Sequence, residues 1–263
     1  MLLPRIIPCL LIRDKGLVKT VQFDGFKYIG DPINTVRIFN EKEVDELIVL
    51  DIDASARGAE PDYRMIKNLA AESRMPLCYG GGVRTVEQAK KVISLGVEKV
   101  AISSAAIDDL SLISRVAEEV GTQSVVAVLD VKASHMGGYV VWTHNGTKST
   151  NRSPKDLAIE LEKAGVGEVI LNSIDNDGLM KGYDIKMVEA VHEYISVPLT
   201  VLGGAGSVKD ISKLIRRFGV IGAAAGSLFF FKGTYRAVLI NYPSVRERDQ
   251  IIKDNLHERL SLA

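Results

Sequence analysis

The chain has little that would suit a secreted, membrane-embedded or nucleic-acid-binding protein. Only two of its 263 residues are cysteines, and Cys9 and Cys78 both lie in apolar runs, which indicates buried free thiols and not a disulfide framework. No apolar run reaches the roughly 18 residues that span a bilayer, and the apolar N-terminus is too short for a signal peptide. A net charge of zero gives no electrostatic footprint for nucleic acid. We therefore expect a cytoplasmic protein with no membrane and no nucleic-acid partner.

Histidine is also scarce. The four histidines are scattered without metal-ligand spacing, and no Ser-His-Asp or Cys-His arrangement can be argued from their positions. The sequence therefore predicts neither a metal site nor a cofactor. With 46% hydrophobic and 25% charged residues, the composition is that of an ordinary globular protein.

What the sequence does contain is an internal repeat. Residues 76–82 (PLCYGGG) align with residues 198–204 (PLTVLGG), and residues 46–51 (ELIVLD) align at the same spacing with residues 168–173 (EVILNS). Near the start of each half, residues 6–11 (IIPCLL) match residues 125–130 (VVAVLD). The second half ends this run in Asp130, whereas the first half ends it in Leu11.

Apolar runs of strand length alternate with longer amphipathic segments along the whole chain, which predicts covered parallel strands. Strands are expected near 5–11, 46–51, 76–79, 98–102, 125–131, 168–172, 198–202 and 220–225. Helices are expected near 31–44, 62–74, 85–95, 108–120, 154–164, 184–195, 207–217 and 234–241. Eight such units predict one α/β domain over 1–263, a (β/α)8 TIM barrel of two similar half-barrels, about 1–120 and 121–243. An open doubly wound sheet is the alternative, and the polar tail 244–263 is expected to form a solvated helix.

The longest irregular stretches are expected at 12–30 and 132–152, after the first and fifth strands. These two positions are equivalent under the repeat, and loops that follow strands form the catalytic face of such a barrel. The second stretch contains Gly137-Gly138, an apolar run and Asn145-Gly146, which together predict a β-hairpin insertion.

Two glycine clusters follow the third and seventh predicted strands. Backbone amides without a neighbouring Cβ can close on an anion, and a helix N-terminus adds favourable partial charge. Hydroxyl or amide donors follow the fourth and eighth strands, and Asp177-Gly178 follows the sixth. We therefore predict two phosphate sites on opposite sides of the barrel mouth; tight turns without a ligand are the alternative. The predicted substrate-binding residues are Lys19, Gly81, Gly82, Ser103, Ser104, Asp177, Gly178, Gly203, Gly204, Gly226 and Ser227.

Asp130 is the first choice for a general acid/base, because a carboxylate at the C-terminal end of a barrel strand usually serves catalysis or binding. It could instead only orient a lysine or cap a loop. Asp51, Asp53 and Asp175 are further carboxylates near strand ends. Leucine cannot transfer a proton, so Leu11 impairs any mechanism that needs two opposed carboxylates.

Charged residues begin four of the strands, at the face opposite the predicted site: Arg5, Glu46, Lys99 and Glu168. If their side chains turn inward, two cations and two anions form a neutral ring across the lower opening. From the residues alone, a stabilising cluster of salt bridges is the preferred interpretation of this ring.

The chain resembles the cyclase subunits of imidazole glycerol phosphate synthase, the HisF family, along almost its whole length. The matching segments are residues 5–10, 30–32, 45–47, 50–52, 80–82, 130, 177–178, 182–184 and 203–206. The resemblance implies a lyase-class, ammonia-dependent synthase that works with a class I glutaminase docked on the barrel bottom. It also implies that Arg5, Glu46, Lys99 and Glu168 form an ammonia gate, which favours the gate over the purely structural ring.

The departure from that family is Leu11, where its cyclases carry an aspartate paired with the one that matches Asp130. The chain also resembles a paralogous branch linked to acetamidino modification of sugars in surface polysaccharides. The segments that carry this second resemblance are residues 9–11, 19–21, 28–32, 78–82, 143–147 and 236–243. It implies that ammonia delivery is kept while the acceptor is changed.

The leading hypothesis is therefore the synthase subunit of a glutamine amidotransferase that aminates or amidinates a phosphorylated, sugar-type acceptor. The first alternative is the imidazole glycerol phosphate synthase cyclase of histidine biosynthesis, with Leu11 tolerated. The second is a noncatalytic ammonia conduit and scaffold, and a related isomerase barrel is a more distant fourth.

Overall fold

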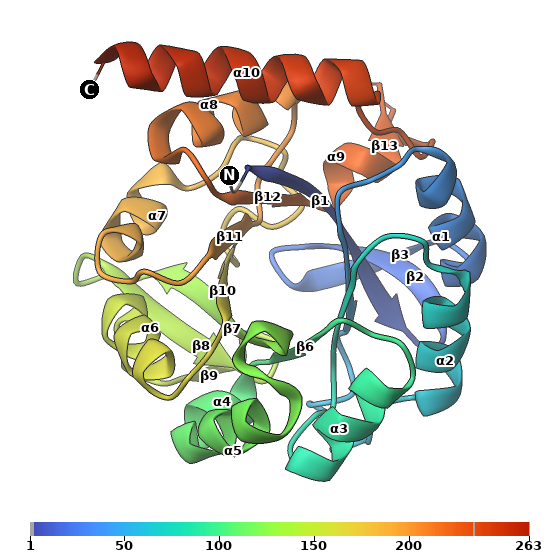
Figure 1. Cartoon of the computed structure of the whole chain (residues 1–263), viewed down its shortest axis with the longest axis vertical. Coiled ribbons are helices and arrows are strands. Elements are labelled where there is room, and N and C mark those ends of the chain that lie inside the picture. Colours follow the sequence, from blue (N-terminus) through green and yellow to red (C-terminus); the bar gives the residue numbers. More distant parts are fainter. Residues whose placement is uncertain (1–2, 234, 263) are drawn as a thin grey trace.

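Eight parallel strands close into a barrel, in the order β1-β4-β5-β6-β7-β10-β11-β12, with β12 returning to β1 (Figure 1). The computed structural model describes residues 3–233 and 235–262, and from 256 onward it describes the helix but not its side chains. The barrel strands are β1 (Arg5–Arg13), β4 (Leu47–Asp51), β5 (Leu77–Gly80), β6 (Lys99–Ile102), β7 (Val125–Ala133), β10 (Glu168–Ser173), β11 (Leu199–Leu202) and β12 (Gly222–Ala225). The predicted (β/α)8 barrel is confirmed, and the open sheet is excluded.

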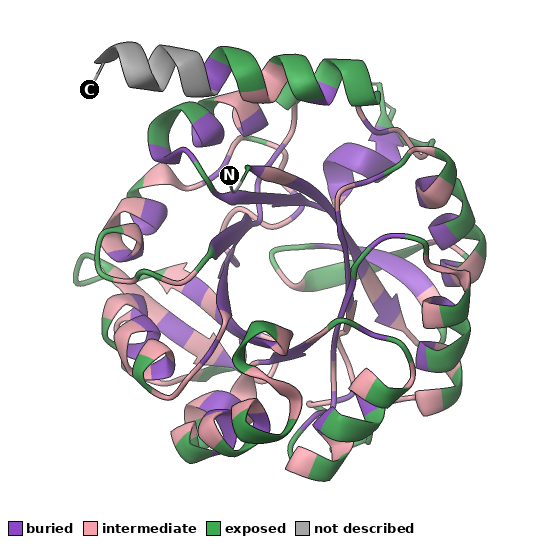
Figure 2. Ribbon diagram, viewed as in Figure 1, coloured by how far each residue is buried: buried purple, intermediate pink, exposed green. Residues whose placement is uncertain are grey.

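Helices surround the barrel, and their buried faces turn toward the strands (Figures 1 and 2). They are α1 (Pro32–Glu41), α2 (Tyr63–Glu72), α3 (Val86–Ser94), α4 (Ser104–Asp108), α5 (Leu110–Val120), α6 (Pro154–Lys163), α7 (Ile185–His192) and α8 (Val208–Phe218), with a 3-10 turn η1 (Thr122–Ser124). Local sequence accounts for two of the helix starts: Thr85 and Gln88 form a capping box at α3, and Ser153 caps α6 ahead of Pro154.

Two antiparallel extensions rise from opposite sides of the barrel, after β1 and after β7. The first is β2 (Gly16–Val21) with β3 (Asp24–Gly30), and the second is β8 (Tyr139–Thr143) with β9 (Lys148–Ser149). The predicted hairpin in 132–152 is therefore confirmed, whereas the expectation of an irregular segment over 12–30 is wrong.

The predicted helix over 234–241 is also wrong. A short helix, α9 (Ser227–Phe230), leads into β13 (Phe231–Lys232) and β14 (Ala237–Val238), which pair as a small antiparallel ribbon. Positive φ angles at Gly233 and Arg236 turn the chain between these strands and are incompatible with a helix there. Residue 234 lies outside the described residues.

The place of an eighth outer helix is taken by α10 (Val245–Leu262), which lies along α8 (Figure 1). The helix predicted for the polar tail is confirmed, but it is not wholly solvated. Arg248 and Asn255 are buried, and Arg248 forms an ion pair with Asp45 at the start of β4. Tyr242 reinforces this contact, because its hydroxyl donates a 2.7 Å hydrogen bond to the carbonyl of Ile6.

The apolar core has two parts. The larger lies between strands and helices, and the smaller lies inside the barrel. The inner cluster consists of Ile7, Cys9, Ile48, Cys78, Ala101, Val126, Val128, Ile170, Leu202 and Ala224. Both cysteines are buried free thiols, as predicted. Among residues 3–233 and 235–262, no helix combines the length and apolar character of a membrane-spanning segment.

Candidate active site

One deep cavity opens at the C-terminal ends of the barrel strands. It encloses about 1250 Å³, including the solvent space at its open mouth. All the predicted substrate-binding residues line this cavity, together with Asp130 and Leu11: Leu11, Lys19, Gly81, Gly82, Ser103, Ser104, Asp130, Asp177, Gly178, Gly203, Gly204, Gly226 and Ser227. Asp53 and Asp175 do not line it.

The two glycine clusters face each other across the mouth, because β5 and β6 lie opposite β11 and β12 in the barrel. Both clusters also have a structural need for glycine. A Cβ at Gly82 would come within 2.7 Å of the Ala59 carbonyl oxygen, and one at Gly204 within 2.2 Å of that of Gly182. Tight turns therefore explain the glycines without a ligand, and phosphate binding stays a prediction that the shared cavity makes geometrically feasible.

Lys19 reaches the second cluster from β2. Its ammonium group donates a 2.8 Å hydrogen bond to the carbonyl of Cys9. It also packs against Gly226, so closely that a Cβ on this glycine would lie 2.6 Å from the Lys19 nitrogen. The side chain is 5% exposed, and this burial lowers its pKa. A buried cation beside Gly226 and Ser227 adds positive charge to the wall where an anion is expected.

Asp177 ties the first extension to the barrel. Its carboxylate accepts hydrogen bonds from the Thr20 hydroxyl at 2.6 Å and the Phe23 amide at 3.3 Å, and burial raises its pKa. Gly178 packs against the same segment so closely that a Cβ would lie 2.1 Å from the Thr20 carbonyl oxygen. In this structure, both predicted binding residues therefore hold the β2–β3 hairpin over the cavity.

Asp130 and Leu11 lie near the C-terminal ends of β7 and β1, on opposite sides of the barrel, and both line the cavity. Burial raises the pKa of Asp130 to about 6, although a 2.9 Å hydrogen bond from Asn172 works in the opposite direction. Such a carboxyl can take up or release a proton near neutral pH. Leu11 instead packs with Leu50 against the inner apolar cluster, so the wall facing Asp130 offers no proton donor at that position.

The other carboxylates near strand ends have local partners. Asp51 lines the cavity but accepts hydrogen bonds from the amides of Asp53 and Ala54. Asp53 pairs with Arg13 and Arg57, and Asp175 accepts a bond from the Ala133 amide. These contacts shape loops at the rim and leave Asp130 as the carboxylate best placed for chemistry.

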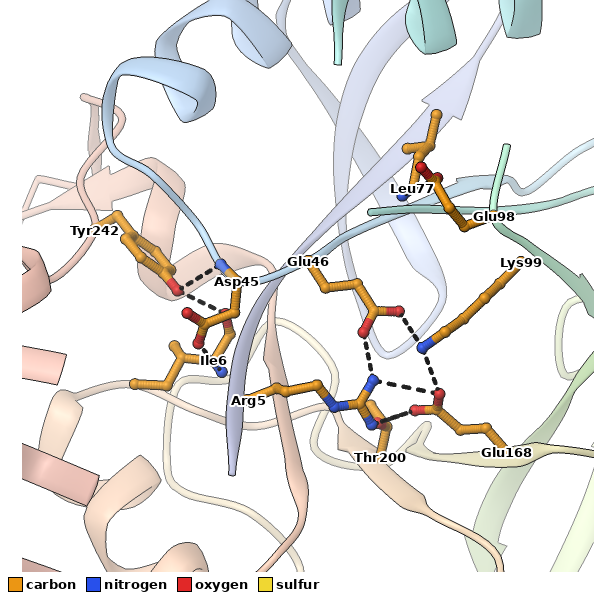
Figure 3. Close-up of polar contacts among 10 residues, drawn as sticks. All are labelled: Arg5, Ile6, Asp45, Glu46, Leu77, Glu98, Lys99, Glu168, Thr200 and Tyr242. Atoms are coloured by element: carbon orange, nitrogen blue, oxygen red, sulfur yellow. Dashed lines mark hydrogen bonds and ion pairs between the residues drawn. The ribbon is translucent and has the colours of Figure 1, made fainter. Parts of the chain in front are cut away.

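At the lower opening, the four charged residues at the strand starts turn inward and form a closed ring (Figure 3). Arg5 pairs with Glu46 and, at 2.8 Å, with Glu168. Lys99 completes the ring with bonds of 2.7 Å to Glu46 and 2.8 Å to Glu168. The carboxylates are nearly inaccessible, with 4% and 6% side-chain exposure, whereas Arg5 and Lys99 keep 25% and 19%.

The ring contains a member that sequence reasoning missed. Thr200 donates a 2.5 Å hydrogen bond to Glu168 and accepts a longer one from Arg5 (Figure 3). The pKa of Lys99 is lowered by burial, but the two glutamates outweigh this effect and raise it above its usual value. Glu168 behaves in the mirror sense: burial raises its pKa, and the two cations bring it below normal. Lys99 and Glu168 are thus each held in the charged form.

Asn172 is the second residue that sequence reasoning missed. It lies beside Asp130 in the register of β10 with β7, and the signal was present because it ends the apolar run 169–171 as Asp130 ends its own. In the other half of the repeat its counterpart is Leu50, so the repeat did not indicate a polar role at this position. On β10, Ile170 of the inner apolar cluster lies between Asn172 and the ring residue Glu168.

Comparison with known proteins gives a consistent result. The model of the family described as histidine biosynthesis protein matches residues 5–235. A Pseudomonas aeruginosa protein, provisionally named imidazole glycerol phosphate synthase subunit hisF2, is 56% identical over 93% of this chain and 98% of its own length. A Leptospira borgpetersenii protein, provisionally named subunit HisF, is 53% identical over 95% and 99%. The Lactococcus lactis protein named imidazole glycerol phosphate synthase subunit HisF, without that qualification, is 38% identical over 88% and 90%.

Proposed function

Because the chain belongs to the histidine biosynthesis protein family, we propose that it is the ammonia-using subunit of a glutamine amidotransferase with an altered acceptor. A class I glutaminase docks on the lower face and releases ammonia there. The ammonia passes Arg5, Glu46, Lys99 and Glu168 and rises to a phosphorylated, sugar-type acceptor in the upper cavity. The single observation that carries this proposal is the pairing of a complete charged ring with Leu11 in the acid/base position.

The ring supports a role in controlled passage. Its ion pairs alternate in sign and close on themselves, so an opening requires at least one cation to leave its partners. The cations keep more exposure than the glutamates, so a docked partner would reach the cations first. A docked partner that forms an ion pair with Lys99 or Arg5 would open the ring only while it is bound.

The upper cavity supports an acceptor with two anionic ends. Gly81, Gly82, Ser103 and Ser104 form one wall, and Gly203, Gly204, Gly226 and Ser227 form the opposite wall, with Lys19 beside the second. Phosphates held at both walls would place the middle of the acceptor over Asp130. Asp130 then acts alone as acid/base, because Leu11 supplies no second group.

Growth of a strain that lacks the histidine-pathway cyclase tests this proposal. We expect the chain, expressed with its glutaminase, to give no robust growth on minimal medium, because removing one partner of an acid/base pair costs a factor of about 10² to 10⁴ in rate. A cyclase of the same family serves as the positive control. Robust growth would reject the altered acceptor and establish the ordinary cyclase.

The ordinary cyclase is the second candidate, and one observation favours it. A relative named imidazole glycerol phosphate synthase subunit HisF is 38% identical over 88% of this chain.

A noncatalytic conduit is the remaining alternative, and Asp130→Asn in the reconstituted complex distinguishes it from both enzymes. The variant abolishes product if Asp130 moves a proton, whereas a conduit keeps its output.

A further inference from the structure

We propose that Asn172 is the ammonia-binding residue of the upper cavity, which receives neutral ammonia and presents it to the acceptor. This inference rests on the proposed use of ammonia, but it concerns a different residue and a different step. It is carried by a buried, unsatisfied hydrogen-bond acceptor in a residue that lines the cavity.

The two ends of the Asn172 side chain have different surroundings. Its amide nitrogen donates a 2.9 Å hydrogen bond to Oδ1 of Asp130, whereas its Oδ1 is buried and has no hydrogen-bond partner. The opposite orientation of the amide would place two oxygens together, so the bond to Asp130 fixes which end is free. The side chain is 5% exposed and lines the cavity. A buried acceptor without a partner is costly, and a ligand that supplies an N–H removes that cost.

Asn172 lies on the same inward face of β10 as the ring residue Glu168. Side chains alternate along a strand, so the inward-facing residues of β10 are Glu168, Ile170 and Asn172 in succession. Glu168 belongs to the ring and Ile170 to the inner apolar cluster. Asn172 is thus the first polar side chain above the ring on that strand.

The amide of Asn172, unlike a carboxylate in its place, adds no negative charge that would hold the nitrogen as ammonium. A carboxylate stabilises the cation, whose nitrogen has no lone pair left for attack, whereas a neutral amide oxygen accepts one N–H and leaves the lone pair free. Leu11 and Leu50 keep the facing wall apolar, so no second carboxylate competes there for a cation. Asp130, held through its other contact with Asn172, remains available for the proton that nitrogen loses once it is attached.

A direct test uses the whole protein labelled with ¹⁵N-asparagine, with ammonia itself as the probe. We expect the Asn172 side-chain signals to shift saturably with ammonium chloride above the pKa of ammonium. The shift should fade below that pKa and be absent with potassium chloride at the same ionic strength. A shift that is equal with potassium chloride, or equally strong at low pH, would overturn the proposal.

Two variants sharpen the result. Asn172→Leu should abolish the binding, as followed by shifts of the Asp130 carboxyl signal, whereas Asn68→Leu on the exposed face of α2 should leave it unchanged. Asn172→Asp should reverse the pH preference, so that binding strengthens where ammonium dominates. Retained neutral-ammonia binding in either Asn172 variant would contradict the assignment.

The outcome is distinguishable from failure of the proposed function. In a glutaminase-free assay driven by ammonium salts, we expect Asn172→Leu to raise the KM for ammonia by about tenfold with a smaller change in kcat. An unchanged KM would reject the role of Asn172 alone. Ammonia binding at Asn172 without any glutaminase-dependent product would reject the proposed function and leave this inference standing.

Discussion

Leu11 is the residue on which the proposed change of acceptor depends. It lies against Leu50 and the inner apolar cluster, so an aspartate introduced there would be poorly solvated and would have a raised pKa. We expect Leu11→Asp to lower the free energy of unfolding by about 1–3 kcal/mol. If the rest of the cavity still fits the cyclase substrate, the variant should also raise growth in the complementation assay. A stable variant with no gain in growth would show that the acceptor site has diverged beyond this position.

Asp130 makes a prediction about pH. Its pKa is about 6 in the folded protein because of burial, above the value of about 3.9 for an unfolded chain, so the folded state binds the proton more tightly. Ionisation therefore costs stability as the pH rises through this window. We expect Asp130→Asn to stabilise the protein at pH 7.5 by about 2 kcal/mol more than at pH 4.5, measured by urea unfolding. An equal effect at both pH values would mean that the carboxyl titrates normally.

At the scale of elements, the β2–β3 hairpin depends on a contact distant in sequence. Thr20→Val keeps the shape of the side chain but removes the hydrogen bond to Asp177. We expect amide exchange in residues 16–30 to become about tenfold faster, because local opening loses one opposing bond, while exchange in the barrel strands stays unchanged. Thr20→Ser retains the hydroxyl and should behave like the native protein. Uniformly faster exchange throughout the barrel would argue against a local role.

Hydrophobic periodicity predicted the barrel strands and most helices, because each buries a continuous face along its own length. It failed for 12–30 and 234–241, where structure depends on partners elsewhere. The β2–β3 hairpin is anchored by Asp177, and the ribbon after α9 turns at positive φ angles that the local pattern did not indicate. For the same reason α10, whose pattern is largely polar, was not predicted to cover α8. Its buried Arg248 forms an ion pair with Asp45, about 200 residues away in sequence, which compensates the buried charge.

At the scale of the whole molecule, strand ends located the site because a parallel barrel gathers them at one mouth. Asp130, Leu11 and the four charged residues could be predicted from the sequence. Asp130 and Leu11 stand at the C-terminal ends of apolar runs, and the four charged residues stand at the starts of such runs. The sequence could not show that Asn172 bonds to Asp130 or that Thr200 joins the ring, because both contacts depend on register between strands. The pairing of neighbouring strands thus brings polar residues that are distant in sequence together, in the upper cavity and in the lower ring.

The ring itself can be tested as one unit drawn from β1, β6, β10 and the start of β4. Lys99→Met leaves two nearly inaccessible glutamates with Arg5 as the remaining cation, so we expect a loss of about 3–5 kcal/mol in the free energy of unfolding. The cations hold the Glu168 pKa below normal, and a lowered pKa stabilises the fold at neutral pH and less as the pH falls. The difference in the free energy of unfolding between the native protein and Lys99→Met should therefore become smaller as the pH falls.

Two comparisons make this prediction decisive. Adding Glu46→Gln to Lys99→Met balances the charges again and should recover most of the lost stability in a double-mutant cycle. Lys90→Met, which removes an exposed pair with Glu119, should change stability by less than about 1 kcal/mol. If Lys99→Met cost no more than Lys90→Met, the four charges would act independently, and a closed ring would not describe the lower opening of the barrel.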